Sequence, residues 1–314
     1  MSDKESNDEI QVISERLQTA TTIDSTCNNS QHQEKASRKG PPPEGKKPCP
    51  LTTGTSTAST TITSTILEDY VQVRSVPELN LPEKIVLVID TVREQQCTPF
   101  KLGTGATFPP LYMIKRVVEN FVGAKSTIQP GVHEYALMSL DSRGASWLCD
   151  YTSNVKSLVG HLEGVEDTPD EERGTCDLGR LFETIHGRIA TPSTSQPLFV
   201  SRVILVYGRS NSIPKFHTGQ KYLESLTKNP YFFLDVLFVH EPASEDNLCE
   251  AVYAEIAALD TTSYSYIFEV GRNAAKLHDN MAKLLAHPLQ RPLQKDAFYT
   301  FASNAVAQEV HTNV

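Results

Sequence analysis

The residue best placed to do chemistry in this sequence is Asp90, which directly follows the apolar run Ile85–Ile89. Such a run is typical of a strand that is buried on both faces, and ligands of open α/β sheets bind beyond the carboxyl ends of such strands. A carboxylate at this position is a candidate ligand for Mg²⁺, which prefers oxygen atoms in near-octahedral geometry. Asp90 therefore marks the place where a metal site is expected.

The segment after Asp90 resembles the metal-binding segment of von Willebrand factor A domains, which reads Asp-x-Ser-x-Ser. In those domains the carboxylate and the two hydroxyls hold a magnesium ion. This chain has Val92 and Glu94 at the two serine positions. The valine side chain has no oxygen and the glutamate side chain is longer than serine, so the resemblance implies a metal site that has lost its ligands.

Two further loops resemble the rest of that metal site. Residues 174–179, Gly-Thr-Cys-Asp-Leu-Gly, are similar to the family's Gly-Thr-Asn-Leu-Gly loop with one extra residue, and they supply Thr175. Residues 204–209, Ile-Leu-Val-Tyr-Gly-Arg, are similar to the strand end Ile-Leu-Val-Thr-Asp-Gly, with Tyr207 and Gly208 at the Thr-Asp positions. Three fragments in the right order are more specific than any one of them.

Among the matched positions, only Asp90 and Thr175 keep oxygens for a metal ion. One carboxylate and one hydroxyl make a weak magnesium site even when water fills the other places, and Glu94 swinging in would change the geometry. We therefore predict no bound metal and a surface that serves other proteins. The local alternatives are that Asp90 binds backbone amides and that Thr175 or Asp177 caps the following helix.

Strand and helix patterns alternate after residue 78. Apolar patterning predicts strands at 84–90, 133–140, 145–151, 202–207, 231–240 and 264–270. It predicts helices at about 110–123, 153–162, 177–189, 218–228, 244–259 and 273–286, the first ending near Gly123 and the second capped by Ser153 or Asn154. This order predicts a mostly parallel α/β sheet of the von Willebrand factor A-like (Rossmann-like) class, with helices on both faces.

Composition divides the chain into three parts. Residues 1–78 are rich in Ser, Thr, Asn, Gln, Lys, Glu and Pro. We expect a disordered arm there, because such a sequence buries too little apolar surface to offset chain entropy; a small cryptic domain is the alternative. Residues 79–287, roughly 210 residues, suit one domain. Residues 288–314 form a separate tail.

Charge and cysteine content exclude several classes of partner and site. The net charge of −9, from 29 basic and 38 acidic residues, argues against a nucleic acid or an anionic membrane as partner. The six cysteines contain no Cys-x-x-Cys pair, which argues against a disulfide framework or a zinc module. The N-terminus lacks an apolar signal core, and no apolar run approaches the roughly 18 residues that span a bilayer. We therefore expect a protein of the cytosol or nucleus.

The motifs of common enzymes are missing from the sequence. It has no phosphate-binding Gly-x-x-x-x-Gly-Lys-Ser/Thr loop, no Gly-x-Ser-x-Gly elbow and no His-x-His or His-Glu-x-x-His pair. We predict no catalytic residue and no cofactor. The competing hypothesis of a small-molecule enzyme needs a convergent polar site, which the sequence does not offer.

The most specific resemblance lies at the end of the predicted domain. Residues 275–292, AKLHDNMAKLLAHPLQRP, closely resemble the C-terminal signature of the von Willebrand A-like subunit shared by the BRISC deubiquitinase complex and its nuclear sibling, the BRCA-A complex. Residues 82–86 and 229–236 also resemble that family, so the resemblance covers about residues 80–300. It implies a non-catalytic scaffold subunit of an assembly that cleaves signalling-type ubiquitin chains.

The resemblance also implies partners and a location. The direct partner is a subunit built of ubiquitin-conjugating-enzyme-like domains, and a zinc-dependent deubiquitinase subunit with its inactive MPN-domain partner is bound indirectly. The implied location is cytoplasmic and nuclear, with a role in the DNA damage response and DNA repair. Which of the two complexes the chain serves stays open, and a metal-dependent ligand-binding A domain is the alternative.

Residues 288–314 are predicted to be an extended partner-binding tail. Pro288 and Pro292 prevent a helix from continuing and favour extended backbone. The predicted contact residues are Pro288, Leu289, Gln290, Arg291, Pro292, Leu293, Phe298 and Tyr299. An extended segment with large apolar side chains suits a groove on a partner. The alternative is that the tail folds back onto its own domain.

Overall fold

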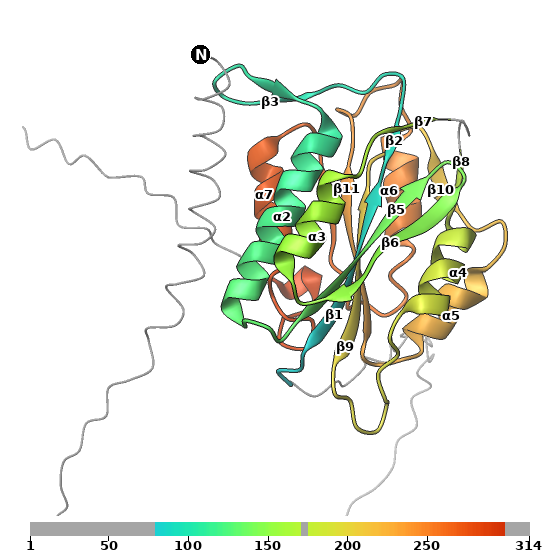
Figure 1. The fold of residues 1–314 in the computed structure, drawn as a ribbon. Coiled ribbons are helices and arrows are strands. Elements are labelled where there is room, and N and C mark those ends of the chain that lie inside the picture. Colours follow the sequence, from blue (N-terminus) through green and yellow to red (C-terminus); the bar gives the residue numbers. More distant parts are fainter. Residues whose placement is uncertain (1–78, 171–174, 299–314) are drawn as a thin grey trace, which may run out of the picture.

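A central twisted sheet organises the computed structural model, which describes residues 79–170 and 175–298 (Figure 1). The sheet has the spatial order β12-β11-β9-β1-β5-β6. Its strands are β12 (Ile267–Val270), β11 (Phe232–Val239), β9 (Val200–Tyr207), β1 (Glu83–Asp90), β5 (Glu134–Asp141) and β6 (Gly144–Thr152). The first five are parallel, and β6 is antiparallel to β5. This confirms the predicted von Willebrand factor A-like class.

Helices cover both faces of this sheet (Figure 1). One face is covered by α2 (Pro110–Ile128), α3 (Val155–Glu163) and α7 (Ala274–Lys283), and the other by α4 (Leu178–Arg188), α5 (Gln220–Thr227) and α6 (Cys249–Ala257). Short strand pairs lie in the loops: β2 (Val92–Arg93) with β7 (Thr168–Pro169), β3 (Phe100–Lys101) with β4 (Thr107–Phe108), and β8 (Thr175–Asp177) with β10 (Ile213–Lys215). A 3₁₀ turn, η2 (Gln294–Asp296), follows α7.

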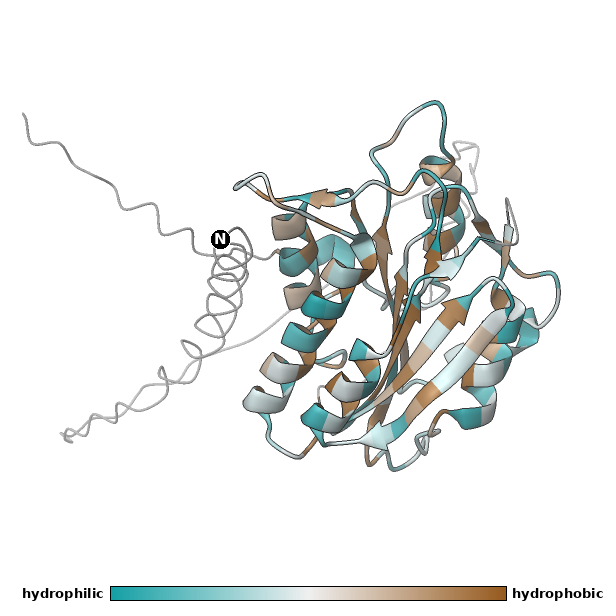
Figure 2. Ribbon diagram, turned by 45° about the horizontal axis from the view of Figure 1, so that its top comes forward, coloured by the Kyte–Doolittle hydropathy of each residue, from teal (hydrophilic) through white to brown (hydrophobic). Residues whose placement is uncertain are grey.

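The central strands are apolar because both of their faces are buried. Every residue of β9 and β11 is buried, and in β1 only Lys84 is partly exposed. Figure 2 shows hydrophobic residues concentrated on these strands and hydrophilic ones on the outer faces of the helices. Each fully buried aliphatic or aromatic side chain contributes ~1.5–3 kcal/mol, so these strands supply much of the stability.

The structure corrects the predicted end of α2 and decides between two predicted caps at the start of α3. Gly123 does not end α2, which continues to Ile128. A Cβ at Gly123 would meet no atom within 4 Å, so no close contact requires glycine there. At the start of α3, Asn154 is the N-cap and its side chain accepts a hydrogen bond from the Ser157 N–H at 3.2 Å. Of the two predicted caps, the structure thus selects asparagine.

The β5–β6 hairpin turns at the predicted residues. Asp141 Oδ1 accepts the N–H groups of Arg143 and Gly144 at 2.7 and 2.9 Å. Gly144 has φ of 145°, a conformation that favours glycine. The turn projects beyond the carboxyl end of β5, where the functional residues below are gathered.

Candidate functional site

Asp90 forms a buried ion pair with Arg209 at the carboxyl end of β1. Arg209 Nε lies 3.0 Å from Asp90 Oδ1 and 3.1 Å from Oδ2, and Nη2 lies 3.0 Å from Oδ1. The backbone N–H groups of Val92 and Gly208 donate to the same carboxylate at 3.3 and 3.1 Å. Asp90 thus binds backbone amides, as one local alternative predicted. It also binds the guanidinium group of Arg209.

Arg209 is held in place by the residues around it. It follows Gly208 at the end of β9, and its Nη2 donates to the Asp141 carbonyl at 3.2 Å. Burial opposes the guanidinium charge, but the pKa of Arg209 is raised because the Asp90 carboxylate lies against it. A Cβ at Gly208 would lie 3.9 Å from Asp90 Oδ2, an ordinary contact distance, so the Gly208 position lies directly against the carboxylate.

Glu94 does not turn toward Asp90 as a substitute ligand. Its carboxylate accepts the backbone N–H groups of Ser210 and Asn211 at 2.8 and 2.7 Å. Burial raises the pKa of Glu94 even though these two hydrogen bonds favour its charged form. Glu94 therefore fixes the loop that follows β9.

The other matched positions also have structural roles. The side chain of Val92 is buried, and Thr175 opens β8, where it pairs with Ile213 of β10. Asp177 is the N-cap of α4, and its Oδ1 accepts the Gly179 N–H at 2.9 Å. Of the two caps predicted for this helix, Asp177 is the one observed.

These residues do not fit a magnesium ion. The carboxylate that should lead the coordination shell is already paired with a guanidinium, and Glu94 is committed to backbone amides. Within residues 79–170 and 175–298, no group of three or more His, Cys, Asp or Glu side chains is arranged to hold a metal. The end of the sheet is therefore a closed polar cluster in which Arg209 supplies the positive charge.

Sequence reasoning missed the role of Arg209. It lies directly after the Gly208 position, and its charge is the only signal that the sequence gives. A basic residue one position beyond the expected metal ligands is indistinguishable from a surface arginine until its burial is known.

Residues 288–297, which follow α7, fold back onto the amino ends of the strands. The alternative hypothesis for the tail predicted such a contact with its own domain. Leu289 packs in a small apolar cluster with Val200, Tyr231 and Phe233. His287 Nε2 lies 2.9 Å from the Leu81 carbonyl oxygen. The packed region therefore extends past residue 287, where the sequence places the domain boundary.

Arg291 is the central anchor of this folded-back segment. Its Nη1 donates to Asp235 Oδ2 at 2.9 Å, its Nη2 donates to Asp235 Oδ1, and Nη2 also donates to the Tyr264 carbonyl at 2.9 Å. The guanidinium lies 3.9 Å from the centroid of the Tyr266 ring. Such a two-pronged pair is specific to arginine, because lysine cannot donate in parallel.

Gln294 attaches the segment to the outer edge of β12. Its Oε1 accepts the Ile267 N–H at 2.7 Å, and its Nε2 donates to the Ile267 carbonyl at 2.7 Å. The amide side chain thus makes the two hydrogen bonds that a neighbouring strand would make. The Tyr266 hydroxyl adds a third contact by donating to the Pro292 carbonyl at 2.7 Å.

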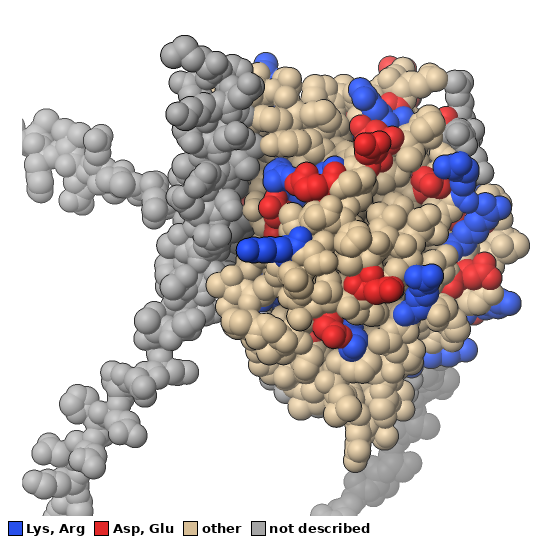
Figure 3. All heavy atoms as spheres, in the orientation of Figure 1, with Lys and Arg blue, Asp and Glu red and all other residues tan. Residues whose placement is uncertain are grey.

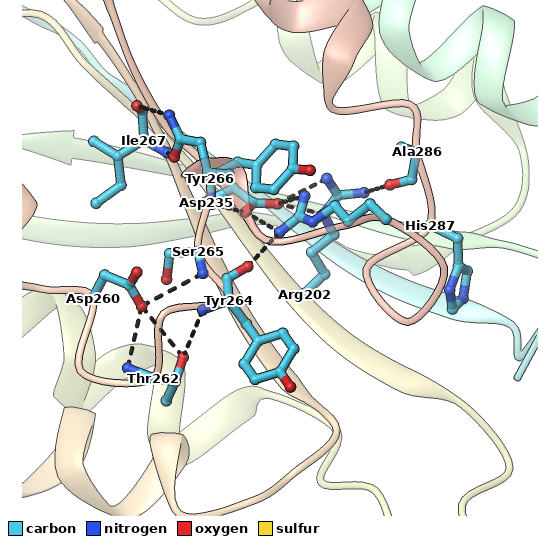
Figure 4. Close-up of polar contacts among 12 residues, drawn as sticks. Arg202, Asp235, Asp260, Thr262, Tyr264, Ser265, Tyr266, Ile267, Ala286 and His287 are labelled. Atoms are coloured by element: carbon cyan, nitrogen blue, oxygen red, sulfur yellow. Dashed lines mark hydrogen bonds and ion pairs between the residues drawn. The ribbon is translucent and has the colours of Figure 1, made fainter. Parts of the chain in front are cut away.

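A buried charge cluster underlies this anchor, and Figure 4 shows its Arg202–Asp235 part. Arg202 Nε donates to Asp235 Oδ2 at 2.8 Å, and its Nη1 donates to Glu83 Oε2 at 3.0 Å. Lys125 pairs with the other oxygen of Glu83. Burial alone would raise the pKa of Glu83, but its pKa is lowered because Lys125 and Arg202 lie against it. These groups tie β1, β9, β11 and the tail together.

The predicted partner-contact residues have different surroundings. Pro288, Leu289 and Arg291 are buried in their own domain, Leu293 is half-buried, and Gln290 and Pro292 are exposed. Phe298 is 94% exposed. Tyr299 lies outside the described residues. Residues 288–297 are thus not a free extended segment, because Arg291 and Gln294 bind groups of the domain. The contact of these residues with a partner protein stays a prediction.

No helix of the described residues is long and apolar enough to cross a membrane. No protein-family model matches the chain.

Solved structures with a related fold include a von Willebrand factor type A protein from Catenulispora acidiphila. It is 14% identical, covers 67% of this chain and 43% of its own, and has a TM-score of 0.42. The SpRpn10 VWA domain is 12% identical, covers 64% of this chain and 93% of its own, and has a TM-score of 0.40. At these TM-scores the likeness carries no functional information, and the fold assignment stands on the strand order.

Curated relatives give a closer match along the sequence. "BRISC and BRCA1-A complex member 1" of Danio rerio is 34% identical over 234 residues, which are 71% of this chain and 62% of the relative. The mouse protein of the same name is 34% identical over 240 residues, 73% of this chain and 70% of its own length. The human protein is 34% identical over 240 residues, with 73% and 71% covered. The chain thus spans slightly less than two thirds of the zebrafish relative and slightly more than two thirds of the mammalian ones.

With this identity over more than two thirds of the mouse and human relatives, the chain belongs to the BRISC and BRCA1-A complex member 1 family.

Proposed function

We propose that this chain is a non-catalytic scaffold subunit of a deubiquitinase assembly of the BRISC and BRCA1-A type. The observation that carries the proposal is the likeness to complex member 1, at 34% identity over 240 residues of the human protein. The assembly would cleave signalling-type ubiquitin chains through a separate zinc-dependent subunit. The chain itself would act by holding that assembly together.

The end of the sheet near Asp90 supports a role without bound metal. Arg209 forms an ion pair with the Asp90 carboxylate, which a metal-dependent A domain would use to bind its metal ion. This ion pair supports a function in which no magnesium ion bridges a ligand to Asp90. The alternative function, metal-dependent ligand binding, has no observation in its favour.

The direct partner in this proposal is the ubiquitin-conjugating-enzyme-like subunit, which binds the C-terminal tail. Residues 288–297 are fixed on the domain by Arg291 and Gln294. Phe298 then projects a large apolar side chain that the domain does not cover. Exposed aromatic groups on short segments are suited to grooves on partner proteins.

The zinc-dependent deubiquitinase subunit and its inactive MPN-domain partner would be held indirectly, through the conjugating-enzyme-like subunit. The implied location is cytoplasm and nucleus, and the nuclear complex implies a contribution to DNA repair. Neither a nucleic acid nor a membrane is part of the proposal, and the net charge of −9 agrees with that.

Affinity capture of the tagged full chain from its own cells, followed by mass spectrometry, tests this function. We expect comparable amounts of a conjugating-enzyme-like subunit and a zinc-dependent deubiquitinase, with chain-cleaving activity in the eluate. Depleting the conjugating-enzyme-like subunit should remove the deubiquitinase from the eluate as well. Recovery of the chain alone, or with a membrane receptor, would refute the scaffold function.

A further inference from the structure

A hollow of about 330 Å³ lies beyond the carboxyl ends of β5 and β9, next to the Asp90–Arg209 pair. Its walls come from four parts of the sequence: the β5–β6 turn, the junction of β8 with α4, the loop after β9, and the segment between β10 and α5. The residues that matter here are Asp141, Arg143, Gly144, Arg180, Arg209 and His217. The hollow is at the opposite end of the sheet from the C-terminal tail, so the inference does not depend on the proposed function.

Two guanidinium groups at this hollow lack a carboxylate partner among the described residues. Arg180 lies across the hairpin turn and its Nη1 donates to the Arg143 carbonyl at 2.6 Å. A Cβ at Gly144 would lie 3.4 Å from Arg180 Cδ, so the Arg180 side chain packs against the turn. Arg143 and Arg180 are both exposed to solvent. Figure 3 shows basic side chains gathered along the edge of the molecule where β8, β10 and α4 lie.

The acidic groups of the hollow are already engaged by backbone donors. Asp141 Oδ1 accepts two N–H groups of its own turn. Asp177 Oδ1 accepts the Gly179 and His217 N–H groups at 2.9 and 3.3 Å. Asp90, behind Arg209, is neutralised by that arginine. The guanidinium donors of Arg143 and Arg180 therefore remain available at this hollow, and the exposed imidazole of His217 lines it as well.

These contacts favour a singly charged planar anion over a phosphate group. A carboxylate accepts two parallel N–H groups from a guanidinium, and a prepositioned arginine loses little freedom when it binds one. The carboxylates of Asp141 and Asp177, which also line the hollow, repel any anion, but they repel a doubly charged phosphate about twice as strongly as a singly charged carboxylate.

We infer that this hollow binds an acidic side chain of a protein partner, with Arg180 as the main contact and Arg143 beside it. Arg209 forms the fixed floor of the site. The carboxylate is thus recognised by arginine side chains at the end of the sheet, without a bridging metal. Binding of a single residue is weak, because exposed charge pairs are screened by water and salt.

Nuclear magnetic resonance of the full chain tests the inference directly. The probe is N-acetyl-glutamate methylamide, and the uncharged control is N-acetyl-glutamine methylamide. We expect the Nε–Hε signals of Arg180 and Arg143 to shift saturably with the glutamate probe and not with the glutamine probe. Arg180→Gln should weaken binding roughly fivefold.

Arg188→Gln is the matched control variant, because Arg188 is an exposed arginine at the other end of the same helix and lies over the Trp147 ring. It removes the same charge and should leave binding unchanged. Equal weakening by both variants would reduce the effect to overall charge and overturn the proposal. So would equal shifts with the glutamine probe, or tighter binding of inorganic phosphate at the same signals.

A last variant addresses competition from within the chain, since Glu171 and Glu172 precede β8 in the sequence. If the probe binds only after both residues are changed to glutamine, carboxylates of the chain itself occupy the hollow. That result would refute the role of a protein partner. Binding by the unchanged chain supports it. Thermal unfolding of each variant confirms that the fold is kept.

Discussion

Arg291 and Asp235 lie 56 positions apart in the chain and are joined by two hydrogen bonds inside the protein. Asp235 is fully buried in β11, and Arg291 belongs to the segment after α7. Burial alone would raise the pKa of Asp235, but its pKa is lowered because Arg291 and Arg202 lie against it. The pair therefore makes the C-terminal segment part of the folded domain.

Arg291→Ala is expected to destabilise the domain by about 3 kcal/mol, because removing one partner leaves a buried carboxylate less compensated. Urea unfolding monitored by circular dichroism measures this change. Arg291→Lys should recover only part of the loss, since lysine cannot make the two-pronged contact. Unfolding curves that coincide with the wild type would contradict the anchoring role.

Two truncations separate anchoring from partner binding. Deleting residues 298–314 should leave thermal unfolding unchanged and weaken co-purification with the conjugating-enzyme-like subunit, because it removes Phe298 and keeps Arg291 and Gln294. Deleting residues 288–314 should impair both. If the shorter deletion binds the partner as well as the full chain does, the exposed end of the tail is not the contact.

Asp90→Ala should lower the free energy of unfolding by about 3 kcal/mol, because Arg209 would be buried without its carboxylate. The double variant Asp90→Ala/Arg209→Met should cost less than the sum of the two single changes, since it removes both charges together. Denaturant unfolding of the three variants measures this coupling. Complex assembly should survive Asp90→Ala, and an assembly defect that magnesium chelation reproduces would revive the metal hypothesis.

Magnesium should not raise the melting temperature of the wild-type chain, because the Asp90 carboxylate is already paired with Arg209. A ligand present at a hundred times its dissociation constant would stabilise the folded state by about 2.7 kcal/mol, which thermal unfolding detects. The comparison is between excess magnesium and a chelator at equal ionic strength. A magnesium-dependent rise in the wild type would show that the site still binds metal.

Stability should fall as the pH is lowered from about 6.5 to 4. Burial lowers the pKa of His133 and of His278 to about 4 in the folded chain, whereas an unfolded histidine takes up its proton near pH 6.5. Between these values the unfolded chain binds more protons, so acidification favours unfolding by up to ~1.4 kcal/mol per pH unit for each histidine.

The matched variant for this pH dependence is His278→Leu. Both ring nitrogens of His278 are buried without a hydrogen-bond partner among the described residues, so leucine removes a titrating group at little structural cost. Urea unfolding at pH 7 and pH 5 should show a smaller loss in this variant than in the wild type. An equal loss would assign the pH dependence to other groups.

Burial explains which parts of the structure the sequence could predict. The strands β9 and β11 are buried on both faces, and their continuous apolar runs gave nearly correct bounds. Helix α6 is shorter than the predicted 244–259, because the Asn247 side chain binds the Pro242 carbonyl and holds the preceding residues in a loop. Local sequence carries no signal for such a contact.

The sequence could not predict the pairing of the buried charges, because this pairing also depends on contacts between segments. Arg202 and Asp235 interrupt apolar strands and Arg209 follows one, but the sequence does not show what they pair with, because their partners lie 33 to 119 positions away. The loss of metal ligands around Asp90 was predictable, because it depends on residue types at fixed spacing. The arginine that replaces the metal was not, because its role depends on contacts between distant segments.

Gln294 has a consequence for the behaviour of the protein in solution. An outer strand normally presents unpaired amides that another chain can extend, and aggregation starts at such edges. At β12 the side chain of Gln294 satisfies both backbone groups of Ile267, and Asn280 donates to the Glu269 carbonyl, so these groups are not available to another strand. The segment after α7 thereby protects solubility, and its loss would leave molecules prone to stick to one another through β12.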